Sequence, residues 1–220
     1  MNIMRKAFFL TVVFILIFST GTAYSAEDRI YTAEELLIEN LTIYDKNNKL
    51  PINGIVKLFY DSGKLKRESS YKNGKKHGDD KEYYESGVLE TKIPFNKGEP
   101  HGIAKAYFES GNIESEIPFV DGMAQDIGKE YYESGTLKRE SSLKDGIQHG
   151  VDKLYFEFGT LKADVPFENG KINGIAKVYK ETGDLMTEVL YKNGKTISGY
   201  IYDPYGNKIK MTGEQIKNLD

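Results

Sequence analysis

The chain has 220 residues, with 30 basic and 33 acidic side chains and a formal net charge of −3 at pH 7. A net-acidic chain gains no long-range attraction to nucleic acid, so we expect no nucleic-acid partner, and a membrane partner is only weakly supported for the same reason. There is no cysteine. Disulfides and an acylated N-terminal cysteine are therefore excluded, and stability must come from packing and backbone hydrogen bonds.

Residues 1–25 have the pattern of a secretory signal peptide. Arg5 and Lys6 precede an apolar run over residues 7–18, and small residues then lead to a cleavage position between Ser25 and Ala26. The apolar run is shorter than the roughly 20 residues that span a bilayer, which argues against an uncleaved anchor. We expect the leader to be removed and the mature protein to be exported, to the periplasm or out of the cell.

Residues 26–53 are expected to form an N-terminal cap. The stretch Thr32-Ala33-Glu34-Glu35 is a capping-box pattern that predicts a short helix through about Glu39. Residues 41–53 resemble a degenerate half of the unit that repeats after them.

Residues 54–197 contain six units of equal length without insertion or deletion, marked by three sets of glycines. The first set is Gly63, Gly87, Gly111, Gly135, Gly159 and Gly183; the second is Gly74, Gly98, Gly122, Gly146, Gly170 and Gly194; the third is Gly54, Gly78, Gly102, Gly150 and Gly174, interrupted by Asp126. A period of about 24 residues indicates an array in which each unit packs mainly on its neighbours.

Each unit predicts a β-hairpin, because two extended runs end in glycine-containing turns. Pairs such as Asn73-Gly74 and Asp145-Gly146 favour a type I′ turn, which needs positive φ at both positions. The fold class is therefore all-β, an elongated antiparallel array of about twelve hairpin strands with a short N-terminal helix. Prolines at 94, 118 and 166 predict a bend or a locally unpaired position in the second strand.

Two columns of side chains in the first strand form the candidate binding stripe. A lysine and, two residues later, an aromatic residue recur in every unit, and residues two apart share one face of a strand. The stripe consists of Lys81, Tyr83, Lys105, Tyr107, Lys129, Tyr131, Lys153, Tyr155, Lys177 and Tyr179. The aromatic column is either the core of a thin sheet or a platform for a partner chain or glycan.

In the second strand, an aliphatic column that includes Leu89 is followed six residues later by a column that includes Phe95, and we expect both on one face. Charged residues such as Glu68 and Lys92 are expected on the opposite face. The motif Lys-Arg-Glu-Ser-Ser at positions 66–70 recurs three periods later, at positions 138–142, which indicates that three units doubled to six.

Residues 198–220 are expected to be a C-terminal cap and tail. The register slips by one after Ser198, residues 200–206 resemble a truncated unit, and residues 212–220 predict a short helix or a frayed end.

Three motifs in fixed order resemble the bacterial variant of the MORN (membrane occupation and recognition nexus) repeat. They are Tyr-Tyr-Glu-Ser-Gly-x-Leu-Lys, Tyr-Lys-Asn-Gly-Lys and Lys-His-Gly, and the resemblance covers residues 54 to about 195. It implies a β-hairpin sheet with a binding role and no catalytic residues. Some bacterial proteins built on this variant are called antitoxin-like; an export signal departs from what an antitoxin against an intracellular toxin would carry.

No residue set predicts catalysis, a metal site or a cofactor site. His77, His101 and His149 recur in one inter-unit turn, but neighbouring units place them roughly 10 Å apart, too far to share a zinc ion. The acidic column at the first turn, which includes Asp61 and Glu85, lacks the paired, unequal carboxyls of a glycosidase. We expect turn packing and turn capping instead, and a protein that is not an enzyme.

The sequence leaves three binding functions open. The first is an exported scaffold that binds another protein, with an immunity-like, toxin-neutralising role in the cell envelope as its most specific form. The second is carbohydrate or cell-wall binding, against which the absence of tryptophan counts. The third is a lipid surface, which rests only on the family's name.

Overall fold

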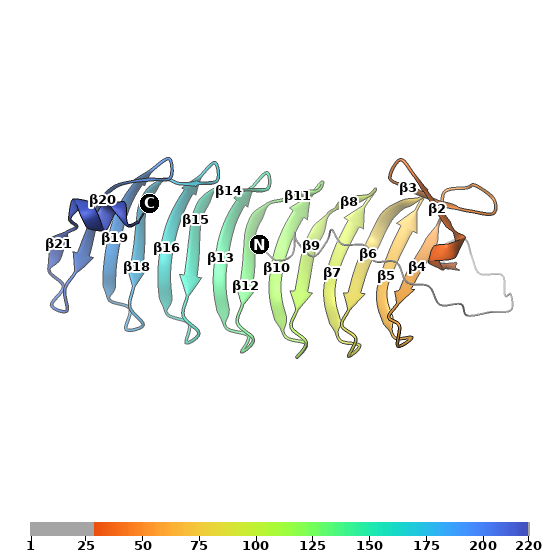
Figure 1. The fold of residues 1–220 in the computed structure, drawn as a ribbon, viewed down its shortest axis with the longest axis horizontal. Coiled ribbons are helices and arrows are strands. Elements are labelled where there is room, and N and C mark those ends of the chain that lie inside the picture. The colour runs from red at the N-terminus through yellow and green to blue at the C-terminus, as the bar shows by residue number, and fades with distance from the viewer. Residues whose placement is uncertain (1–28, 220) are drawn as a thin grey trace. The chain divides into compact units, whose positions relative to one another are not determined.

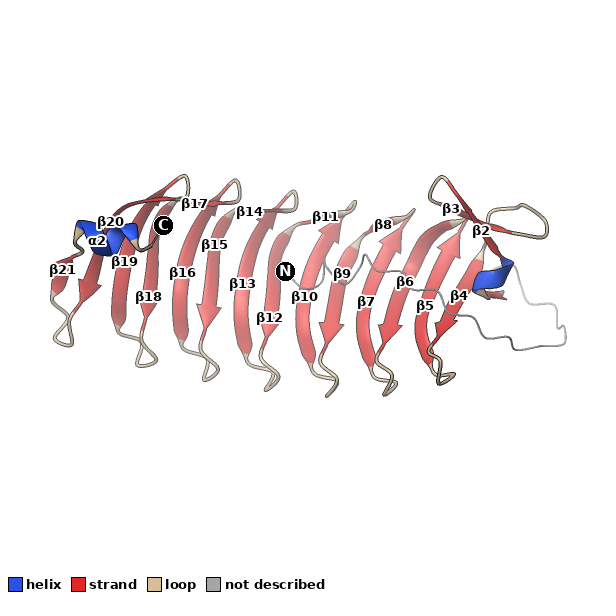
Figure 2. Ribbon diagram, in the orientation of Figure 1, coloured by secondary structure: helices blue, strands red, loops and turns tan. Residues whose placement is uncertain are grey.

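The computed structural model describes residues 29–219, so the expected signal peptide and its cleavage site at Ser25 and Ala26 lie outside the described residues. Figure 2 shows that the described chain consists mainly of strands joined by short loops, with two short helical segments. Its internal contacts divide it into two units. Unit 1 comprises the described residues up to Ile113 with Phe119–Gly122, and unit 2 comprises Glu114–Pro118 with the residues from Met123 onward.

Unit 1 starts with β1 (Ile30–Tyr31), the 3-10 turn η1 (Ala33–Glu35) and the hairpin of β2 (Leu36–Glu39) and β3 (Thr42–Asp45). Its sheet continues through β4 (Gly54–Phe59), β5 (Leu65–Lys72), β6 (Lys75–Tyr83), β7 (Leu89–Asn96), β8 (Glu99–Pro100) and β9 (Gly102–Tyr107). The strands from β4 onward pair antiparallel with their neighbours in chain order, and β1 pairs parallel with β4. β10 (Ile113–Val120) contributes residues to both units.

Unit 2 contains β11 (Met123–Ala124), β12 (Asp126–Tyr131), β13 (Leu137–Lys144), β14 (Ile147–Gln148), β15 (Gly150–Tyr155), β16 (Leu161–Glu168), β17 (Lys171–Ile172), β18 (Gly174–Tyr179), β19 (Leu185–Lys192), β20 (Lys195–Tyr202), β21 (Lys208–Lys210) and α2 (Gly213–Lys217). Its long strands pair antiparallel in chain order, as Figure 1 shows from β12 to β21.

The predicted hairpin turns are confirmed. Asn73 and Gly74 have φ of 52° and 72°, and Asn193 and Gly194 have φ of 52° and 81°, as a type I′ turn requires. In each repeat the hairpin-turn glycine also donates its N–H to a backbone carbonyl of the preceding repeat, as Gly194 does to Ile172 at 2.8 Å. The hairpin turns therefore tie successive repeats together as well as closing each hairpin.

The third glycine set lies at a bulge and not at the inter-unit turn that the sequence predicts. Between the pairs Phe95–Pro100 and Lys92–Lys105, β7 advances three residues while the facing chain advances five. Gly102, in this bulge, has φ of 106°, and a Cβ there would lie 3.1 Å from the Pro94 ring. The proline thus faces a break in the regular pairing, as expected for a residue without an N–H.

A second irregularity overturns the predicted assignment of faces in the second strand. Tyr83 pairs with Leu89 and Glu82 with Thr91, so Glu90 is one extra residue. A single extra residue reverses which face the following side chains occupy. Leu89 and Phe95 therefore lie on opposite faces, contrary to the sequence interpretation. The charged column that includes Lys92 lies opposite Phe95, as expected, and on the same face as Tyr83.

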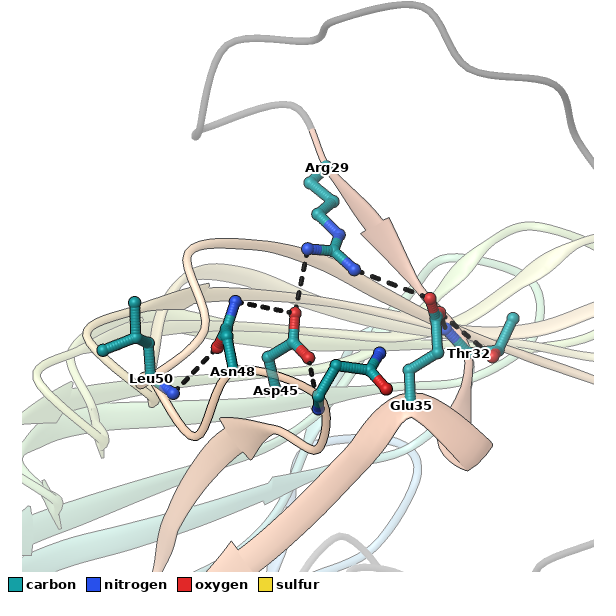
Figure 3. Close-up of polar contacts among 7 residues, drawn as sticks. Arg29, Thr32, Glu35, Asp45, Asn48 and Leu50 are labelled. Atoms are coloured by element: carbon teal, nitrogen blue, oxygen red, sulfur yellow. Dashed lines mark hydrogen bonds and ion pairs between the residues drawn. The ribbon is translucent and has the colours of Figure 1, made fainter.

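The N-terminal helix is shorter than predicted. The capping interaction forms, since the Glu35 carboxylate accepts hydrogen bonds from the N–H and hydroxyl of Thr32 at 2.8 and 3.1 Å. After one turn, however, residues 36–39 pair with β3 as a strand. Figure 3 shows that Arg29 bridges Glu35 and Asp45, with its contact to Asp45 at 2.9 Å, and so links η1 to the end of β3.

The Asp45 carboxylate also closes the turn formed by residues 45–50. Asp45 is buried and accepts hydrogen bonds from the Asn47 N–H at 2.9 Å and the Asn48 side chain at 3.3 Å, and Asn48 in turn accepts from the Leu50 N–H (Figure 3). These residues form a closed turn around an arginine-paired carboxylate.

At the C-terminal end, the predicted slip and short helix are both present. Leu190 pairs with Ser198 and Tyr191 with Thr196, which leaves one extra residue in β20. Thr212 caps α2 by accepting the Gln215 N–H at 3.3 Å, and the Gln215 side chain accepts the Thr212 N–H at 2.8 Å.

The buried residues of the repeats all lie on one face of each unit's sheet, which we call the core face. Most are small; the set includes Val56, Ser69, Asp80, Ala104 and Ala106 in unit 1 and Ser115, Asp152, Ala163 and Val189 in unit 2. In unit 1, Tyr31 and Ile52 of the cap region pack with Val56, and Tyr71 adds to that cluster.

Two carboxylates are buried on the core face, and each is fully surrounded by donors. Asp80 binds Arg67 at 2.6 and 3.0 Å, Ser69 at 2.5 Å, and Lys76. Asp152, in the equivalent place three repeats later, binds Arg139 at 2.6 Å, Ser141 at 3.2 Å and Gln148 at 2.7 Å. The repeated Lys-Arg-Glu-Ser-Ser motif therefore supplies the arginine and serine that make a buried aspartate tolerable.

The bulge glycine Gly150 should be less replaceable than the first-turn glycine Gly159. Gly150 has φ of 111°, and a Cβ there would lie 2.9 Å from that of Ser142, whereas Gly159 has φ of 90° with nothing within 4 Å. We expect Gly159→Ala to lose about 1–2 kcal/mol of unfolding free energy from backbone strain. Gly150→Ala should lose at least about 1 kcal/mol more, because it also overlaps Ser142. Urea unfolding of both variants measures the difference, and equal losses would contradict the bulge interpretation.

Asp80 should make the unfolding free energy depend on pH in the acidic range. Burial alone would raise the pKa of Asp80, but the hydrogen bond from Arg67 and the charge of Lys76 outweigh burial and hold the pKa below its ordinary value. A depressed folded pKa contributes stability above the unfolded pKa of about 3.9, and that contribution is lost as the pH falls through the folded pKa.

We therefore expect Asp80→Asn to lower the unfolding free energy at pH 7 by about 2 kcal/mol and to flatten its fall below pH 4. Urea titrations between pH 2 and pH 7 test this, with the exposed turn variant Asp61→Asn as the control. An acid profile as steep in Asp80→Asn as in the unmodified protein would contradict it.

Candidate binding surface on the lysine face

In each unit, the face opposite the core face carries that unit's part of the candidate stripe, and we call it the lysine face. In unit 2 its centre is a ladder in which acidic and basic residues alternate from strand to strand. By register the ladder runs Glu116, Lys129, Glu140, Lys153, Asp164, Lys177 and Glu188. Each of the three lysines stands directly opposite a carboxylate on both neighbouring strands, an arrangement that stabilises antiparallel pairs.

The tyrosines of the stripe in unit 2 are bound to this ladder by their hydroxyl groups. Tyr131 donates to Glu116 at 3.1 Å, Tyr155 to Glu140 at 3.1 Å and Tyr179 to Asp164 at 3.2 Å. Partial burial and the neighbouring carboxylates raise the pKa of all three phenols. These rings are half-buried and lie opposite the core face, so the aromatic column is not the core of the sheet.

A second row of tyrosines, at the first turns, joins successive repeats. The hydroxyl of Tyr60 donates to the carbonyl of Tyr83 at 2.6 Å, and that of Tyr132 donates to the carbonyl of Tyr155 at 2.8 Å. The ammonium groups of Lys66 and Lys138 lie over the Tyr60 and Tyr132 rings. This row has a structural role, which leaves the stripe tyrosines as the aromatic groups of the open face.

An exposed apolar row on the lysine face was missed by the sequence analysis. Ile127, Val151 and Ile175 of unit 2 are 48%, 43% and 51% exposed, and Ile103 of unit 1 is 52% exposed. Each lies two residues before a lysine of the stripe and so shares its face. Leu190, which pairs with Ile175, is also exposed. The signal was present in the sequence, since five of the six residues at this column are isoleucine or valine.

Unit 1 departs from the alternation. Its ladder runs Lys57, Glu68, Lys81, Lys92 and Lys105, so three lysines stand side by side on β6, β7 and β9. Glu68 lies 3.3 Å from Lys57 and 3.5 Å from Lys81, and Lys92 reaches Asp79 at 2.9 Å.

The histidines and first-turn carboxylates do not gather into a reactive site. His77 lies within β6, and His101 and His149 lie at the bulges before β9 and β15; His101 contacts only Asp121 by ion pairing, at 3.4 Å. Within residues 29–219, no cluster of three or more histidine, aspartate or glutamate side chains could hold a metal ion. In the same range no helix has the length and apolar character of a membrane span.

Comparison with known proteins assigns a family. The sequence model described as MORN repeat variant matches five segments of the chain, at residues 52–73, 76–97, 100–121, 127–145 and 172–193. No curated protein sequence matches the chain significantly. The segment from 148 to 169 has no match of its own, yet it forms the same hairpin of β15 and β16 as its neighbours. The repeat resemblance found in the sequence is confirmed, and the chain belongs to the family of proteins built from MORN repeat variants.

Proposed function

We propose that the protein is a non-enzymatic scaffold that is exported and binds another protein through its lysine face. MORN repeats are generally associated with binding and scaffold roles, and the repeat is a non-catalytic module. The observation that carries the proposal is the exposed row of Ile127, Val151 and Ile175 beside the lysine and tyrosine columns. Exposed β-branched residues in a regular row, flanked by tyrosine hydroxyls and charges, have the composition of a protein interface.

The alternatives are less well supported by the same surface. A glycan platform needs flat, accessible aromatic faces, but the stripe tyrosines of unit 2 are half-buried and bound to carboxylates, and tryptophan is absent. An anionic lipid surface needs net positive charge, but the ladder of unit 2 alternates in sign. A protein partner accommodates apolar, aromatic and mixed-charge features together.

The most specific form of the proposal is an immunity-like role in the cell envelope, in which the bound protein is a toxin. It is supported by the antitoxin-like members of the family that the sequence resembles and by the signal-peptide pattern of residues 1–25. An exported scaffold would meet such a toxin before it reached its target.

The apolar row provides the test. The processed protein, carrying a C-terminal tag, is used to capture partners from cell-envelope extracts and from candidate toxins, and each captured protein is purified and rebound. We expect Ile127→Ser/Val151→Ser/Ile175→Ser to weaken rebinding by roughly tenfold or more, since each exposed side chain contributes about 1 kcal/mol at an interface. Its stability should change little, because the three side chains are exposed in the free protein.

The control variant is Phe158→Ser/Tyr205→Ser, which removes two aromatic side chains that are 90% and 91% exposed and lie in turns away from the row. This control should bind like the unmodified protein. Equal loss in both variants, or capture of peptidoglycan without any protein, would overturn the proposal.

A further inference from the structure

The turn between β2 and β3 departs from the rule that the hairpin turns of the repeats follow. In the six repeats, the second residue of the turn is glycine, with φ between 72° and 97°. In the β2–β3 turn, Asn40 has φ of 49° and is followed by Leu41, with φ of 61°. Within residues 29–219, the other nine non-glycine residues with positive φ are asparagine, aspartate or lysine. Leucine is strained at this φ, because its Cβ approaches the following carbonyl oxygen.

The fold does not stabilise Leu41 through packing. Its side chain is 94% exposed, more than any other large apolar side chain in the part of the chain that the structure describes. Ile38, in the same hairpin, is 64% exposed. A strained backbone position that also exposes an apolar side chain breaks two rules of stable turns at once, which is expected at a functional position.

The base of the hairpin is fixed, although its turn is exposed. Leu36 and Ile43 pack against the buried cluster of the cap region. The Ile43 N–H donates to the Gly74 carbonyl at 2.9 Å, and the Lys46 N–H donates to the Glu35 carbonyl at 2.7 Å. The hairpin therefore presents its turn residues from a rigid support, which reduces the conformational entropy that a contact with a ligand would cost.

The surroundings of the turn indicate what kind of ligand fits it. Residues 36–45 contain Glu39 and Asp45 and no basic side chain. Asp45 is bound to Arg29, whereas Glu39 is exposed beside the turn. Such a hairpin gains no attraction to anionic lipid, and a single leucine buries far less apolar surface than an acyl chain, which alone binds membranes only marginally. A glycan stacks on aromatic rings, which this turn lacks. A protein pocket accepts an aliphatic side chain and a neighbouring charge together.

We propose that Leu41 is an anchor that inserts into an apolar pocket, with a basic residue at its rim, on the partner protein. This inference rests on the proposed function in taking the partner to be a protein, and the contact is separate from the apolar row of unit 2. One large side chain in a pocket that excludes water is the common form of a binding hot spot. The basic residue at the rim complements Glu39.

The first test uses the free protein and measures amide hydrogen exchange in β2 and β3. Leu41→Gly gives this turn the residue of the repeat turns and removes the strain, so exchange should slow by about threefold or more. Leu41→Ala keeps the Cβ and its strain and should exchange like the unmodified protein. Exchange that is unchanged or faster in Leu41→Gly would show that the leucine is not strained or that it stabilises the hairpin, and would overturn the anchor.

The second test measures rebinding of the proteins captured and purified in the apolar-row experiment. We expect Leu41→Gly and Leu41→Ala to weaken rebinding by roughly tenfold or more, and Leu41→Met to retain most of it, because methionine fills apolar pockets of similar size. Glu39→Gln should make rebinding less sensitive to salt. The matched control is Leu50→Ser, which removes a leucine of the same cap region that is 62% exposed and should rebind normally.

The outcomes separate this anchor from the lysine face. Unchanged rebinding in Leu41→Gly and Leu41→Ala would overturn the anchor and leave the lysine-face proposal in place. Weakened rebinding in these variants, with none in the apolar-row variant, would support the anchor and remove the lysine face as the partner's surface. Self-association of the free chain, or binding to vesicles containing phosphatidylserine, would overturn the anchor if either depended on Leu41, because a second copy or lipid would then be its ligand. Capture of no protein at all would remove both proposals.

Discussion

The register of the hairpins is the constraint on which the rest of the structure depends. Most repeats contain a one-residue bulge at the start of the long strand, which exchanges the two faces, and a two-residue bulge after the hairpin turn, which preserves them. After the last hairpin turn only one residue is extra. Because side chains alternate along a strand, an irregularity displaced by one residue in one repeat would move its lysine to the core face. The glycines at fixed intervals hold these irregularities in place, which is why the repeat length stays constant without insertion.

The two faces follow from that register and carry different kinds of stability. The core face is buried with small side chains such as Ala104 and Ala106, so each repeat contributes little apolar area. The repeats are then held together by hydrogen bonds between them. The N–H of each hairpin-turn glycine donates to a carbonyl of the preceding repeat, and first-turn tyrosine hydroxyls donate to a carbonyl of the following repeat. The lysine face adds its charge ladder and leaves its apolar row uncovered.

The sequence predicts the fold well because glycine and Asn-Gly determine the backbone conformation at their own positions. Positive φ at Asn73 and Gly74 is a property of those residues, so hairpins, turn type and repeat period follow from the sequence alone. The assignment of faces was wrong because the extra residue, Glu90, has no signature of its own; only the pairing of Tyr83 with Leu89 reveals it. The N-terminal helix was overestimated because a capping box specifies a beginning but no end, and pairing with β3 ends it after one turn.

The candidate site was only partly visible in the sequence for the same reason. The lysine and tyrosine columns are found by counting along the chain, but the carboxylates between them belong to the neighbouring strand, and their place depends on the bulge. The row that Lys92 forms with Lys81 and Lys105 becomes visible only from the pairing of β6, β7 and β9.

Some residues depart from the pattern of their column in the repeat. The fold surrounds some of these residues with hydrogen-bond and charge partners, and it leaves others with few. Asp80 departs from a column of small residues, and the chain supplies Arg67, Ser69 and Lys76 around it; its burial is explained within the fold. Asp152 departs in the same way and is compensated in the same way. Lys92 departs from a column of carboxylates and receives only an exposed contact with Asp79. Lys92 therefore differs from the two buried aspartates, because no buried partner within the fold accounts for its departure from the repeat.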